Sequence, residues 1–100
     1  MSATLTAGDG GWRIAGTLDF DSVPSLFART DELLAGEAVA VDLSGVESAN
    51  SAGVALLLEW QRLAHERGIR LQLDGIPEAV RRVARLSQVE PLLERADASL

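Results

Sequence analysis

The sequence contains no cysteine and no lysine, and His65 is its only histidine. Without cysteine the chain forms no disulfide framework and carries no thiolate chemistry. Its formal net charge of -6 argues against non-specific binding to nucleic acid or to anionic lipid headgroups. No apolar run approaches the ~20 residues of a membrane span, and no signal peptide is recognisable at the N-terminus. We therefore expect a cytoplasmic protein that does not insert into the membrane and binds no nucleic acid.

The residues that enzymes use are also scarce. In the predicted helix over residues 52–67, His65 lies roughly 20 Å from Ser51 along the axis, which is too far for a serine triad. Asp19 and Asp21 stand between a strand and a helix, where carboxylates more often serve as caps. No metal-ligand spacing, P-loop or dinucleotide fingerprint occurs, and the glycines at positions 8, 10 and 11 precede a strand. We therefore expect no enzymatic activity, no cofactor and no bound metal.

The length of 100 residues corresponds to a single domain, 1–100. Apolar patterning predicts strands at 4–6, 12–18, 39–43 and 70–74, with a turn at Asp42, Ser44 and Gly45 after the third. Helices are predicted at 23–34, 52–67 and 77–86, followed by one short turn at 91–94. The order β-β-α-β-α-β-α indicates the α/β class, with a small mixed sheet of about four strands and helices mainly on one face. The first strand should form a hairpin with the second and lie at an edge.

The helix over 52–67 has two different faces. Asn50 and Ser51 are both suitable N-cap residues, and Gly68 is suited to a left-handed C-terminal position. At ~100° per residue the core face holds Gly53, Leu56, Leu57, Trp60, Leu63 and Ala64. The opposite side holds Ser51, Ala55, Leu58 and Arg62, with Val54 and His65 on its flank. Two interpretations stay open for this side: isolated exposed apolar residues, or a partner surface centred on Ser51 and Leu58.

The third helix shows a simpler pattern. Its predicted buried side consists of Ile76, Ala79, Val80, Val83 and Leu86.

Three motifs together resemble the STAS domain, the fold of anti-sigma-factor antagonists. They are Gly16-Thr17-Leu18-Asp19 at the end of the second strand, Val41-Asp42-Leu43-Ser44-Gly45-Val46 leading from the third strand to a polar loop, and Asn50-Ser51-Ala52-Gly53 at the start of the apolar helix. The resemblance extends over nearly the whole chain and implies the STAS fold.

Within that family the run Gly53-Val54-Ala55-Leu56-Leu57-Leu58 is most similar to the MlaB-type branch. The resemblance implies a non-enzymatic subunit that binds the ATPase (MlaF-like) of an ABC transporter and supports phospholipid trafficking and outer-membrane lipid asymmetry. Such a protein is cytoplasmic and associates with the inner membrane through its partner. The implied partner-binding residues are Asn50, Ser51, Val54, Ala55, Leu58 and Arg62.

The alternative branch is the anti-sigma factor antagonist. This resemblance implies an anti-sigma factor, or serine kinase, as partner and phosphorylation at Ser51. Asn50 stands where both branches usually carry aspartate, so this chain lacks one negative charge beside the Ser51 hydroxyl.

Overall fold

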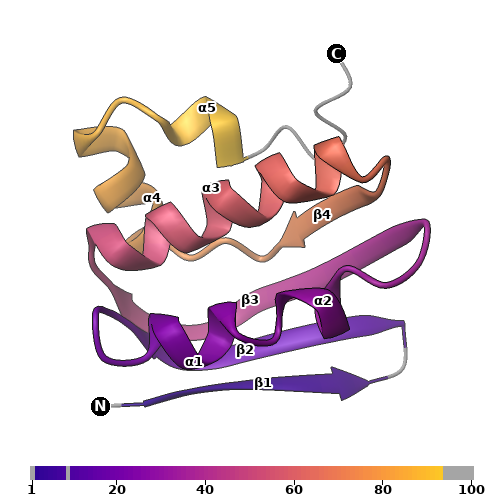
Figure 1. Ribbon diagram of the computed structural model, residues 1–100. Coiled ribbons are helices and arrows are strands. Elements are labelled where there is room, and N and C mark those ends of the chain that lie inside the picture. The colour runs from indigo at the N-terminus through magenta and orange to yellow at the C-terminus, as the bar shows by residue number, and fades with distance from the viewer. Residues whose placement is uncertain (1, 9, 94–100) are drawn as a thin grey trace.

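The computed structural model describes residues 2–8 and 10–93 and shows one α/β unit (Figure 1). The elements follow in the order β1 (Ala3–Gly8), β2 (Gly11–Leu18), α1 (Val23–Phe27), α2 (Thr30–Leu33), β3 (Ala38–Ala49), α3 (Ser51–Glu66), β4 (Arg70–Asp74), α4 (Glu78–Leu86) and α5 (Glu90–Leu93). The four strands form one mixed sheet in the order β1-β2-β3-β4. The α/β class predicted from the sequence is confirmed.

The strand pairing also agrees with the sequence patterning. β1 pairs antiparallel with β2 and lies at an edge, as predicted. β2 and β3 are parallel and end together, with Leu18 opposite Ala49. β4 is parallel to β3 but ends earlier, with Asp74 opposite Asp42. The chain enters α1 and α3 from the shared end of β2 and β3, so the loops that begin these two helices lie close together (Figure 1).

The predicted turn at Asp42, Ser44 and Gly45 is wrong, because β3 continues through it to Ala49. The register with β2 shifts along this stretch, from Arg13 opposite Asp42 to Ala15 opposite Gly45. Asp42 Oδ1 accepts a hydrogen bond from the Ser44 backbone N–H at 2.9 Å, which is the local bond typical of a turn. Here this bond stabilises a bulge within the strand, and it lowers the pKa of Asp42.

The single helix predicted over residues 23–34 is two short helices, α1 and α2, separated at Ala28 and Arg29. At the break, the Thr30 hydroxyl donates a hydrogen bond to the Phe27 carbonyl at 2.6 Å. The same hydroxyl accepts one from the Trp60 indole N–H at 2.9 Å. A threonine that bonds a nearby carbonyl competes with the helical ladder, and Trp60 of the distant α3 holds this threonine in place.

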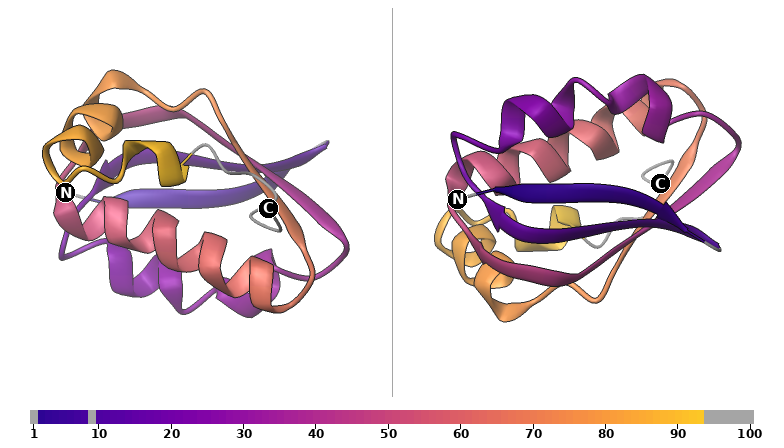
Figure 2. Two further views of the ribbon diagram at one scale, coloured as in Figure 1. Left: turned by 90° about the horizontal axis from the view of Figure 1, so that it is seen from above. Right: turned by 90° about the horizontal axis from the view of Figure 1, so that it is seen from below.

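The helices lie mainly on one face of the sheet, as predicted (Figure 2). α3 crosses the sheet between α1 on one side and α4 and α5 on the other, and these helices pack against it. β4 pairs only with residues 38–42 of β3, and α4 packs against β3 beyond that point (Figure 1). The core between the layers includes Ile14, Leu18, Val41, Leu43, Leu57, Trp60 and Leu71, all fully buried.

The prediction that Leu86 belongs to the buried side of its helix is wrong, because Leu86 is 81% exposed. α4 instead buries Val80 and Ala84. Leu86 lies about 200° around the helix from Ala84 at ~100° per residue, so it faces away from the core.

The bond between Trp60 and Thr30 yields a stability prediction. Replacing Thr30 by valine keeps the shape but leaves the buried indole N–H without its acceptor, which costs about 1–3 kcal/mol. Thr30→Ser keeps the hydroxyl and loses one methyl group, which is worth about 0.8 kcal/mol. Urea unfolding should therefore rank the stabilities wild type, Thr30→Ser, Thr30→Val in descending order. Equal stability of the two variants would show that the hydrogen bond contributes nothing.

Candidate partner-binding surface

The first turn of α3 is fixed by Asn50. Its backbone is extended, with φ -118° and ψ -169°, and its Oδ1 accepts the Ala52 N–H at 2.9 Å. Its own N–H donates to the Leu18 carbonyl at 3.0 Å, which ties the start of α3 to the end of β2. Asn50 is therefore the N-cap, and Ser51 is the first helical residue. Of the two N-cap candidates, Asn50 occupies the position, which leaves the Ser51 side chain at an exposed site.

Gly53 lets the helix lie directly on β2. A Cβ at this position would come within 2.6 Å of the Leu18 Cβ and 3.0 Å of the Leu18 carbonyl oxygen. Both distances are shorter than ordinary van der Waals contacts, so no larger residue fits without a shift of the backbone. The Asn-Ser-Ala-Gly sequence thus combines a cap with a close helix–strand contact.

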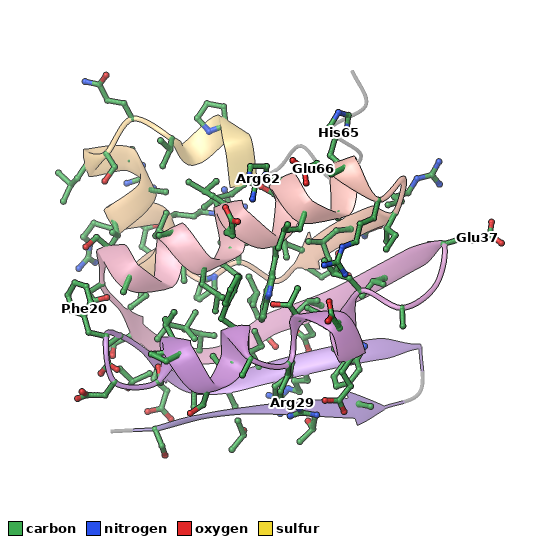
Figure 3. All side chains as sticks on the ribbon, viewed as in Figure 1. Phe20, Arg29, Glu37, Arg62, His65 and Glu66 are labelled. Carbon is green, nitrogen blue, oxygen red and sulfur yellow. The ribbon has the colours of Figure 1, made fainter. Side chains whose placement is uncertain are left out.

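The turn between β2 and α1 lies beside this helix start. Asp19 Oδ1 accepts the backbone N–H groups of Asp21 and Ser22 at 2.9 and 3.0 Å, which closes a turn ahead of α1. The expectation that Asp19 caps the helix is wrong, because Ser22 is the N-cap of α1 and no side chain caps its first turn. The Ser22 hydroxyl donates to the Thr17 carbonyl at 2.7 Å. Phe20, held between these bonds, is 71% exposed at the end of the molecule where α3 begins (Figure 3).

The structure brings four of the six predicted partner-binding residues together on the outer side of α3. Ser51, Ala55 and Arg62 are exposed, and Leu58 is half-buried against the core. We call these four residues the α3 ridge. They follow one another along the helix axis, with the Ser51 hydroxyl at the amino-terminal end and the Arg62 guanidinium near the other end. Asn50 lies just before the ridge and is half-buried.

Val54 does not belong to this surface, because it is only 3% exposed. Both α4 and α5 contact α3, and Val54 lies about two turns before Gln61 on the same side of the helix. Gln61 is buried as well, and its Nε2 donates to the Leu93 carbonyl of α5 at 2.8 Å. No periodic signal in the sequence marks Gln61 as buried, because its partner is a backbone atom 32 residues away.

Arg62 is paired within its own helix. It forms hydrogen-bonded ion pairs with Glu59 and with Glu66, on the preceding and the following turn. The hydrogen bond from Arg62 lowers the pKa of Glu59, and the hydrogen bond to Glu59 raises the pKa of Arg62. Because Arg62 and Glu66 are more than half exposed and Glu59 is partly exposed, this network contributes little to stability. The amino-terminal half of the α3 ridge is therefore apolar apart from the Ser51 hydroxyl, and its carboxyl-terminal half is charged.

His65 lies in the last turn of α3, at the opposite end of the helix from Ser51. In the described residues, no group of three or more His, Cys, Asp or Glu side chains is placed to hold a metal ion. Among the same residues, no helix has the length and apolar character needed to cross a membrane.

The four-stranded mixed sheet, with the capped α3 beginning at the carboxyl end of β3, is consistent with the STAS fold that the resemblance implies. The family model described as "Mlab, STAS domain" matches residues 2–94. The chain therefore belongs to the MlaB-type STAS domain family, and the family resemblance seen in the sequence is confirmed. No curated protein sequence matches the chain.

Solved structures with the same fold include two anti-sigma factor antagonists. SpoIIAA, in its unphosphorylated form, is 23% identical, with a TM-score of 0.66 over 90% of this chain and 84% of that one. An anti-sigma factor antagonist from Mycobacterium paratuberculosis is 24% identical, with a TM-score of 0.61 over 89% and 79% of the two chains. A third structure, Mglu, is 18% identical, with a TM-score of 0.60; the match covers 77% of this chain but only 20% of that longer one.

The contact between Gly53 and Leu18 leads us to expect that a larger residue at position 53 lowers the free energy of unfolding. Alanine normally stabilises a helix interior by about 1 kcal/mol relative to glycine. Forcing a methyl group into a packed contact costs about 1–3 kcal/mol, so we expect Gly53→Ala to lower stability. Ala55→Gly, at an exposed site of the same helix, measures the propensity contribution alone. A rise in the free energy of unfolding of Gly53→Ala, measured by urea denaturation, would contradict the close contact.

Proposed function

We propose that this protein is a non-enzymatic subunit that binds the ATPase of an ABC transporter through the α3 ridge. In this role it supports phospholipid trafficking and outer-membrane lipid asymmetry, and the ATPase holds it at the cytoplasmic side of the inner membrane. One observation carries the proposal: a chain of the MlaB-type family exposes Ser51, Ala55 and part of Leu58 on the outer side of α3, a helix that packs closely on β2.

The ridge has the physical properties of a protein-binding surface. Ala55 is small, so the backbone of a partner can approach α3 closely at its centre. Leu58 keeps part of its apolar side chain accessible while the rest packs against the core, so it loses little freedom when a partner covers it. Arg62 is already paired with Glu59 and Glu66 and belongs to the polar rim, where single residues contribute little to affinity.

Substitutions on the ridge should separate binding from folding. We expect Ala55→Arg and Leu58→Asp to weaken binding to the transporter ATPase by about thirtyfold or more, the effect of losing an interface hot spot. The measurement is co-purification of the two subunits after co-expression, followed by titration of the purified proteins. Ala35→Arg places the same side chain at an exposed site outside the ridge and should bind like wild type.

Circular dichroism of each variant tests whether the fold is retained. Ala55 is exposed, so Ala55→Arg should fold normally even if the charge at Leu58 disturbs the core. Stoichiometric co-purification of a folded Ala55→Arg variant would show that the ATPase does not bind at the ridge.

A second function is favoured by one feature of the site, the exposed hydroxyl of Ser51 at the first position of α3. Two proteins of similar fold are anti-sigma factor antagonists, and one of them is named in its unphosphorylated form. A phosphate on Ser51 would lie at a helix N-terminus, where backbone N–H groups and the helix dipole favour an anion. The added charge would then change the affinity for an anti-sigma factor or its serine kinase.

The two functions differ in the covalent state of the protein in its native cells. The antagonist function predicts a form that carries one phosphate on Ser51 in at least one growth state, detected by intact-mass spectrometry and lost in Ser51→Ala. The transporter function predicts unmodified protein in every state. Absence of a phosphorylated form from all growth states would therefore exclude the switch.

A further inference from the structure

The outer edge of β1 exposes backbone groups that can pair with another strand. The Thr17 N–H donates to the Ser2 carbonyl at 3.1 Å, and antiparallel pairs alternate between bonded and non-bonded residues. In the register that places Leu5 opposite Ile14, the backbone groups of Ala3, Leu5 and Ala7 therefore point away from β2. Within residues 2–8 and 10–93 no strand pairs with this edge.

Arg29 covers the middle of this edge. It lies in the connection between α1 and α2, next to β1 (Figure 3). Its Nη1 donates to the outward-pointing Leu5 carbonyl at 2.5 Å. Its Nε and Nη2 donate to the two carboxylate oxygens of Glu32 at 2.9 and 3.0 Å. Its guanidinium also stacks over the Trp12 ring, 5.5 Å from the centroid.

These contacts hold the guanidinium in one orientation. The planar guanidinium of arginine suits a carboxylate on one side and a carbonyl on the other, and stacking on an aromatic ring restricts it further. An incoming strand would need the Leu5 carbonyl as an acceptor and would have to displace a charged group from the edge. Charged side chains at sheet edges are one of the ways by which proteins prevent edge-to-edge association.

We propose that Arg29 closes the outer edge of β1 to strand addition, and that a second copy of this chain pairs through β1 when the guanidinium is removed. β1 suits pairing with itself, because Thr4 and Thr6 are exposed while the intervening Leu5 is buried. An antiparallel β1–β1 pair related by a two-fold axis would extend the polar and the apolar face of both sheets. This surface is separate from the α3 ridge, so the inference does not depend on the proposed function.

The test compares the self-association of wild type and Arg29→Met by sedimentation equilibrium over a concentration series. Methionine keeps an apolar stem over Trp12 but removes all donors. We expect Arg29→Met to associate at least about tenfold more strongly than wild type, the effect of one hydrogen bond to a charged group. Arg82→Met removes the same charge from an exposed site on α4 and should associate like wild type.

A proline at position 7 tests whether the self-association occurs through the outer edge of β1. The Ala7 N–H points outward, so Ala7→Pro removes an edge donor without breaking a bond to β2. We expect the double variant Arg29→Met/Ala7→Pro to return to the association of wild type. Equal association of wild type and Arg29→Met would overturn the proposal, and so would association that persists in the double variant.

Glu32→Gln provides the test if Arg29→Met does not fold. This variant leaves Arg29 in place but removes the charge that orients it, and Glu32 is exposed. We expect association between that of wild type and the value predicted for Arg29→Met, again reversed by Ala7→Pro. Association equal to wild type in a folded Glu32→Gln protein, together with an unfolded Arg29→Met, would show that Arg29 serves only to stabilise the fold.

Discussion

The contact between Gly53 of α3 and Leu18 of β2 determines where the other elements lie. With no side chain on Gly53, the helix comes close enough for Asn50 to bond to the Leu18 carbonyl, and α3 therefore begins at the carboxyl end of the parallel strands. That starting point turns Leu57 and Trp60 into the core and leaves Ser51 and Ala55 outside. The candidate binding surface and the core are thus two consequences of one close approach.

The sequence predicts the parts of the fold that depend on neighbouring residues. The alternation at Arg70–Asp74, the glycine with φ +70° at position 68 and the apolar stripe of α3 all arise within one element, and the structure shows each of them. The break between α1 and α2 is different, because it depends on Trp60, 30 residues after Thr30. The length of β3 is different too: Asp42 makes the bond of a turn, but pairing with β2 keeps the chain extended.

The residues of the candidate site also divide into those that the local pattern predicts and those that depend on distant contacts. Ser51, Ala55 and Arg62 are outward by their position on an ideal helix, so periodicity alone identifies them. Val54 and Gln61 are buried on one flank of α3, where Gln61 bonds to Leu93 of α5, and no pattern within the helix reveals this contact. Phe20 lies in a turn fixed by the hydrogen bond that Asp19 Oδ1 accepts and by the one that the Ser22 hydroxyl donates. Nothing in the sequence around Phe20 indicates that this apolar side chain is exposed.

Asparagine at position 50 caps α3 without adding the negative charge that an aspartate would bring. Its amide oxygen satisfies the Ala52 N–H, as an aspartate oxygen would, so the helix start does not require an acid at this position. An aspartate would also place a negative charge against the positive end of the helix dipole and beside the Ser51 hydroxyl. The neutral cap leaves that dipole uncompensated. Because the first turn of α3 holds no acidic residue, the neutral cap adds no charge that would repel a negative group beside Ser51.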